Sequence, residues 1–149
     1  MRIGLISDTH GLLRPEAVTA LQGVDLIVHA GDVGGLKVVE ELRRVAPVHA
    51  VAGNVDAAGS YPPAVDLVLA GVRLHVSHGH EVGSPTPERL AALTAADVIV
   101  YGHTHRALIR RVGNTLVVNP GAAGPARFRL TPSVALLDLP SCEATIVHL

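Results

Sequence analysis

Five short apolar runs in the first two-thirds of the chain are each followed by residues that can bind a metal ion. A short apolar run bounded by turn-forming residues is typical of a strand buried on both faces of a parallel sheet. In an open α/β sheet, ligands gather beyond the carboxyl ends of the strands, so we expect the residues after these runs to share one rim. These residues are Asp8-Thr9-His10, Gly31-Asp32, Gly53-Asn54, His78-Gly79-His80 and Gly102-His103-Thr104-His105.

Two helices are predicted between the first three runs, at 15–22 and 36–44. The second of these has apolar residues at helical spacing and places acidic residues before basic ones, as a surface helix does. Strands that alternate with helices in this way pair in parallel and are covered by the helices. The three strands are expected at 2–7, 24–30 and 48–52.

The rest of the chain predicts mainly strands, with one further helix at 87–94 and a strand at 97–101. No helix separates the last four strands, so we expect them to form a second, more antiparallel sheet that packs on the first. The length of 149 residues fits one α/β domain that spans 1–149. The expected hairpins are 64–70 with 72–77, 107–112 with 115–119, and 133–139 with 143–148.

The composition narrows the classes of partner and location. With two Tyr, one Phe and no Trp, the chain lacks the aromatic residues of a base-stacking surface, and it has no basic tract, so we expect no nucleic-acid partner. No apolar run approaches the roughly 18 residues of a membrane span, and the first run is shorter than that of a secretory signal. The lone Cys142 excludes an internal disulfide. We therefore expect a cytoplasmic protein without a membrane partner.

Seven residues on the predicted rim are nitrogen or oxygen donors. A structural zinc site needs four ligands and usually includes Cys, whereas seven donors suffice for two neighbouring ions if one carboxylate bridges them. His103 and His105 would point the same way if the chain is still extended there. Any single pair could be an ordinary turn, but the five together and in order favour a metal centre. The seven candidates are Asp8, His10, Asp32, Asn54, His78, His103 and His105.

The ordered pattern Asp-x-His, Gly-Asp, Gly-Asn, His, Gly-His-x-His resembles that of the calcineurin-like metallophosphoesterase superfamily. Within it, Gly53-Asn54-Val55-Asp56, His78-Gly79-His80 and Asn119-Pro120-Gly121 are similar to the compact bacterial and archaeal phosphodiesterase branch. The resemblance implies a four-layer α/β/β/α sandwich of two packed mixed sheets flanked by helices. It also implies that one ion is held by Asp8, His10, Asp32 and His105, and the other by Asp32, Asn54, His78 and His103.

The resemblance implies hydrolysis of a small phosphate ester by a metal-activated water, and we expect the substrate to be a phosphodiester. Donors without sulfur suit Mn, Fe, Zn, Ni or Co and do not choose among them; we expect Mn to restore activity most readily. Many relatives carry a proton-donating histidine where this chain has Val55, which disfavours substrates with poor leaving groups. The rival hypothesis is a protein-binding scaffold of the same fold, like a retromer subunit, but the complete ligand set favours the enzyme. A homo-oligomer is compatible with either.

Asn54 and His80 are the candidate catalytic residues. His80 lies two residues after His78, so an extended chain would direct both rings to the rim, where His80 could contact phosphate or donate a proton. If Gly79 instead turns the chain, His80 would only orient a metal ligand through a hydrogen bond. His29, His49 and His75 lie inside predicted strands and are interpreted as packing or supporting residues.

Overall fold

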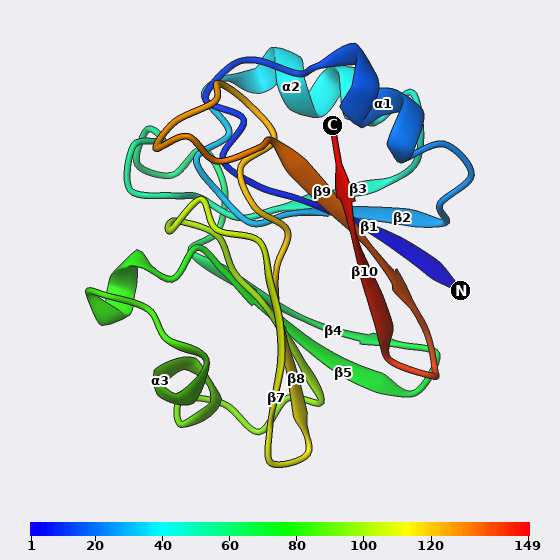
Figure 1. Ribbon diagram of the computed structural model, residues 1–149, viewed down its shortest axis with the longest axis vertical. Coiled ribbons are helices and arrows are strands. Elements are labelled where there is room, and N and C mark those ends of the chain that lie inside the picture. Colours follow the sequence, from blue (N-terminus) through cyan, green and yellow to red (C-terminus); the bar gives the residue numbers. More distant parts are fainter.

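Two five-stranded sheets packed face to face form the centre of the computed structural model, which describes residues 1–149 (Figure 1). The first sheet has the order β10-β9-β1-β2-β3, and the second has the order β4-β5-β6-β8-β7. Both sheets are mixed: β1, β2 and β3 are parallel, as are β5, β6 and β8, and antiparallel strands complete each sheet. The strands are β1 Arg2–Ile6, β2 Leu26–His29, β3 Val48–Ala50, β4 Ala64–Leu69, β5 Val72–Ser77, β6 Val98–Val100, β7 Leu108–Val112, β8 Thr115–Asn119, β9 Ser133–Asp138 and β10 Glu143–His148.

The helices cover the outer faces of the two sheets. Helices α1 (Pro15–Ala20) and α2 (Leu36–Leu42) lie on the first sheet, and α3 (Pro87–Ala91) lies on the second (Figure 1). A short 3₁₀ helix, η1 (His80–Val82), follows β5. None of the helices has the length and apolarity that crossing a bilayer requires.

Three separate hydrophobic clusters lie between the layers. Alternate residues of β1 face opposite sides, so Ile3 and Leu5 join a cluster of 16 buried residues between the sheets, while Ile6 belongs to a cluster of 12 beneath α1 and α2. A cluster of five buried residues lies between the second sheet and α3. Three cores separate four layers, which confirms the predicted α/β/β/α sandwich.

The assignment of the last hairpin to the second sheet is wrong. Strands β9 and β10 return to the first sheet, where β9 pairs antiparallel with β1 and places Leu137 opposite Ile3. Strand β9 is apolar on both faces, since Val134 faces the helices and Ala135 faces the other sheet. A strand of this kind can fill a position beside a buried central strand. The second sheet instead begins with β4 and β5, which the sequence also predicted as a hairpin.

Candidate metal centre

Loops that follow β1, β2, β5 and β6 bring five of the predicted ligands into one cluster. His105 Nε2 lies 3.3 Å from Asp8 Oδ1, and His78 Nε2 lies 3.2 Å from Asp32 Oδ2. His10 Nε2 lies 3.8 Å from a carboxylate oxygen of each aspartate. Ligand atoms of Asp8, His10 and His105 lie within 4.8 Å of one another, and so do those of Asp8, Asp32 and His78. The geometry therefore offers two overlapping groups of ligands.

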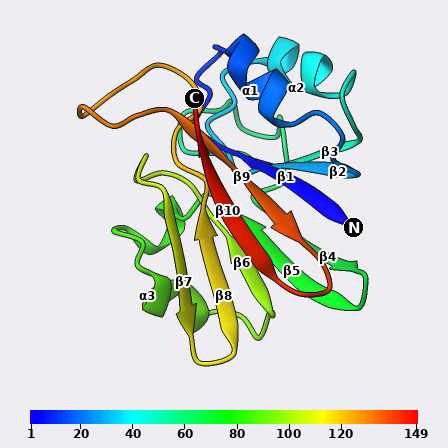
Figure 2. The same cartoon turned by 45° about the vertical axis from the view of Figure 1, so that its right-hand side comes forward.

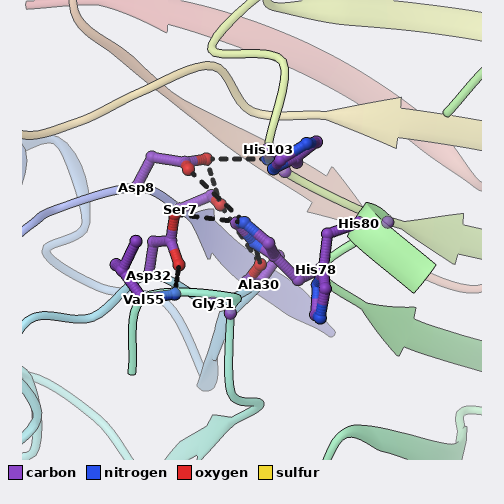
Figure 3. A network of polar contacts seen from close by, with 12 residues as sticks. Ser7, Asp8, Ala30, Gly31, Asp32, Val55, His78, His80 and His103 are labelled. Carbon is purple, nitrogen blue, oxygen red and sulfur yellow. Dashed lines mark hydrogen bonds and ion pairs between the residues drawn. The ribbon is translucent and has the colours of Figure 1, made fainter. Parts of the chain in front are cut away.

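The other predicted site residues surround this cluster. The rings of His103 and His80 lie 5.2 Å and 5.4 Å from that of His78, measured between centroids (Figure 3). Asn54 is exposed in the turn after β3, and its side chain forms no hydrogen bond. The next residue, Val55, donates its N–H to Asp32 Oδ1 at 3.1 Å. Asn54 thus lies in the loop that touches the cluster, and its contact with an ion stays a prediction.

The chain is not extended at His103 and His105, so the condition under which both rings would point the same way is not met. Strand β6 ends at Val100, and the two histidines have φ angles of 68° and 61°, in the left-handed region. This kinked loop directs His105 toward Asp8 and His10, and His103 toward His78. Left-handed backbone costs roughly 1–2 kcal/mol per residue with a side chain, and such strain gathers at functional sites. Three further candidate ligands also have φ angles in the left-handed region, namely Asp8, His10 and Asp32.

The chain also turns at Gly79, whose φ is 99°, so His80 begins η1 rather than continuing β5. The extended alternative for this histidine is therefore wrong. His80 nevertheless stays beside the cluster, and its Nδ1 is buried without a hydrogen bond, 3.7 Å from the carboxylate of Glu81. It forms no hydrogen bond to a candidate ligand.

Hydrogen bonds orient two ligands and leave one acceptor on each free. Asp8 Oδ2 accepts from the Ser7 hydroxyl at 2.6 Å and from the His103 N–H at 3.1 Å, while Oδ1 is buried without a hydrogen bond. His78 Nδ1 lies 2.7 Å from the carbonyl of Ala30, an acceptor only, so Nδ1 carries the proton and Nε2 has a free lone pair (Figure 3). Nε2 is also buried without a hydrogen bond. Buried acceptors without donors are costly, and a bound cation would satisfy both.

The pKa shifts describe a site that favours a positive ion. Burial opposes a charge on His78, but the nearby carboxylates of Asp32 and Asp8 outweigh it, and its pKa is raised. Burial also opposes ionisation of Asp32, but His78 and the Val55 N–H hold the pKa of this carboxyl at about 2. Burial lowers the pKa of His10 and of His103. Ionised carboxylates and neutral imidazoles are the forms that bind metal.

Asp56 joins the loops that carry two of the candidate ligands, a role that sequence reasoning missed. Its Oδ2 accepts from the N–H groups of Gly53 at 2.8 Å and Val33 at 3.1 Å, and its Oδ1 accepts from that of Gly34 at 3.0 Å. The loop after β3 is thereby fixed to the loop after β2. An acidic residue two positions after Asn54 was the available signal, but no local pattern indicates which backbone groups it would reach.

The interpretation of His29 as a supporting residue is confirmed. His29 is fully buried, its Nδ1 accepts from the Gly31 N–H at 3.2 Å, and its Nε2 lies 2.9 Å from the Thr9 hydroxyl. The interpretation is wrong for His49, which is exposed. It is also wrong for His75, which pairs at the surface with Asp66 at 2.7 Å.

Comparison with known proteins places this site in a family. The calcineurin-like phosphoesterase superfamily domain matches residues 1–141. The chain is 39% identical over 150 residues to a probable metallophosphoesterase of Methanothermobacter thermautotrophicus, covering 93% of this chain and 86% of the relative. It is 33% identical over 164 residues to the phosphodiesterase YfcE of Escherichia coli, covering 93% of this chain and 88% of that enzyme.

Solved structures extend the likeness to the whole fold. An archaeal phosphodiesterase superposes with a TM-score of 0.85 at 25% identity, and the match covers 100% of both chains. Vps29 of Entamoeba histolytica in complex with zinc has the same TM-score and identity, with 98% of this chain and 90% of that chain covered.

A cluster of carboxylates and imidazoles at the rim of a four-layer sandwich is the arrangement of a metal-dependent phosphoesterase. The chain belongs to the calcineurin-like phosphoesterase superfamily, and the predictions of this family, of its fold and of an enzyme are confirmed.

Proposed function

We propose that the chain is a phosphodiesterase that binds two divalent ions. Asp8, His10, Asp32 and His105 would hold one ion, and Asp32, Asn54, His78 and His103 the other. The observation that supports this most directly is the pair of free buried acceptors, Asp8 Oδ1 and His78 Nε2, which lie 3.9 Å apart within the cluster. Two neighbouring divalent ions lower the pKa of a bound water and neutralise charge on phosphoryl oxygens.

The donor set supports a transition-metal pair. Imidazole nitrogens and carboxylate oxygens without sulfur suit Mn, Fe, Zn, Ni and Co. Of these, Mn is proposed to restore activity best to metal-free protein.

The substrate is proposed to be a small phosphodiester with a good leaving group. Val55, at the position where many relatives carry a histidine, is exposed and has no proton to donate. His80 is then the histidine beside the cluster without a place among the ligands, and we propose that it contacts phosphate or protonates the leaving group. Its lack of a hydrogen bond to any ligand argues against a purely supporting role.

Metal removal tests this function. Protein stripped by a chelator should lose hydrolysis of bis(p-nitrophenyl) phosphate, and Mn should restore it. His10→Ala should lower the restored rate, whereas His49→Ala, which removes an exposed histidine from β3, should not. Full activity without metal, or alkyl monoesters that react several-fold faster than aryl diesters, would overturn the proposal.

The alternative function is a catalytically weak, protein-binding scaffold, because Vps29 shares the fold. The placement of His10 and His105 beside Asp8 favours the enzyme, since a scaffold has no need of a complete ligand set. Reconstituted protein that binds two ions yet hydrolyses no diester would favour the scaffold. A cytoplasmic location, a small phosphate ester as the partner, no contact with nucleic acid and a homo-oligomer stay predictions that accompany the enzyme.

A further inference from the structure

A cavity of about 630 Å³ adjoins the metal cluster at His105. Its walls come from the segment before α3, from the loop between β6 and β7, and from the long loop between β8 and β9, which extends away from the sheets in Figure 2. The volume lies within the range of roughly 300–1,000 Å³ for pockets that bind small molecules. Because His105 belongs to both the cavity wall and the cluster, a phosphodiester bound at the cluster can extend into the cavity.

The charged side chains that line this cavity are basic. Arg106 and Arg129 line it, and no Asp or Glu does. Both arginines are exposed, and neither side chain forms a hydrogen bond or ion pair. Elsewhere, Arg73 is paired with Asp97 at 2.9 Å. A guanidinium without a partner binds phosphate or carboxylate through two parallel hydrogen bonds.

The loop that carries Arg129 is also strained at the edge of the site. Phe128 and Arg129 have φ angles of 56° and 57°, which side-chain-bearing residues rarely adopt. The Phe128 side chain is 74% exposed, and its ring meets that of His105 at a centroid distance of 5.8 Å. Strain of this kind is retained at binding sites, and here it accompanies an apolar ring that lies beside His105 rather than in the core.

We propose that the cavity binds the ester group that stays on phosphorus, and that this group carries a second anionic centre such as a phosphate or carboxylate. The inference rests on the proposed phosphodiesterase function. During hydrolysis the water oxygen bonds to phosphorus, the bond from phosphorus to the leaving oxygen breaks, and that oxygen takes up a proton. The retained group is unchanged throughout, so contacts with Arg106 and Arg129 lower KM without opposing release of the leaving alcohol.

Two chromogenic substrates with the same leaving group test the inference. One is the p-nitrophenyl ester of thymidine 5′-phosphate, and the other carries an additional 3′-phosphate. We expect kcat/KM to be about tenfold higher for the second, through KM, because hydrogen bonds between charged groups are strong. The ratio of the two kcat/KM values, with the 3′-phosphorylated substrate in the numerator, should fall as ionic strength rises.

Substitutions test whether Arg106 and Arg129 cause the preference for the 3′-phosphorylated substrate. Arg106→Gln and Arg129→Gln should each reduce the ratio, and Arg106→Lys should retain part of it because the charge remains. Arg111→Gln is the matched control, since Arg111 is exposed and unpaired on β7 but does not line the cavity, and it should keep the wild-type ratio. Thermal unfolding of each variant checks that the fold is intact.

A wild-type ratio near one overturns the inference, and so does a ratio that is the same in wild type, Arg106→Gln and Arg129→Gln. Hydrolysis of bis(p-nitrophenyl) phosphate distinguishes the two proposals. If that substrate reacts while the ratio stays near one, only the cavity assignment fails. If no diester reacts although two ions are bound, the proposed function and the cavity assignment fail together.

Discussion

His29 makes the stability of the metal-free protein depend on pH in a way that can be measured. Its Nδ1 accepts from the Gly31 N–H, so in the neutral ring the proton lies on Nε2 and is donated to the Thr9 hydroxyl. That hydroxyl donates in turn to the carbonyl of Val33 at 2.7 Å. Protonation of Nδ1 would place two hydrogens against each other and break the hydrogen bond between His29 and Gly31 in the loop after β2.

The size of the effect follows from the buried position of this ring. Burial lowers the pKa of His29 from 6.5 to about 4. The unfolded chain takes up a proton at this residue below about pH 6.5, and the folded chain does so only below about pH 4. The free energy of unfolding therefore decreases as the pH falls through this window, and the contribution is fully present above it. The difference corresponds to about 3 kcal/mol at pH 4.

The assay is denaturant unfolding of metal-free wild type and His29→Gln between pH 7 and pH 4. Gln cannot titrate, so we expect the variant to be less stable at pH 7 but to lose about 3 kcal/mol less on acidification. His49→Gln, which removes an exposed histidine of the neighbouring strand, should follow the wild-type curve. Parallel curves for wild type and His29→Gln would show that His29 is not held neutral and would refute the hydrogen-bond assignment.

Three further predictions concern the residues around the cluster. Asp56→Ala should leave three backbone N–H groups without their acceptor, so we expect it to lower both the metal affinity and the unfolding temperature. Metal titration and calorimetry measure these two effects, and an unchanged metal affinity would contradict the prediction. Gly53→Ala should displace Asp32, because the added Cβ would lie 2.1 Å from Asp32 Oδ1, and should reduce bound metal. Gly113→Ala is the control: its Cβ would meet no atom and would add only backbone strain in the turn between β7 and β8, so it should keep the metal. His80→Ala should keep its metal content and lose rate: a loss that grows with the pKa of the leaving group indicates a proton donor, a uniform loss indicates a phosphate contact, and wild-type rates would remove His80 from the site.

The strands and the position of the site could be predicted because the information is local. Apolar runs such as 2–7 are buried on both faces, and the donors that follow them meet because parallel strands end at the same edge. Sheet membership could not be predicted in this way. Whether 133–138 pairs with β1 or with β8 depends on contacts between segments far apart in the chain, and the number of intervening helices carries no information about it.

The details of the site were the least predictable part. Left-handed backbone at His103 and His105 replaced the extended conformation, and it is maintained by tertiary contacts such as the hydrogen bond from the His103 N–H to Asp8. The roles of Asp56 and His29 likewise depend on which backbone groups each side chain reaches after folding. Residue types and their spacing thus indicated the chemistry, while the supporting hydrogen bonds required the fold.

The stoichiometry of bound metal tests the central claim most directly. Elemental analysis and native mass spectrometry of protein reconstituted with Mn should give two ions per chain. His10→Ala should lower occupancy mainly at one site, and Asp32→Asn, which alters a carboxylate that lies between His10 and His78, should lower it more and at both sites. One ion or none in fully reconstituted wild-type protein would contradict the two-metal account.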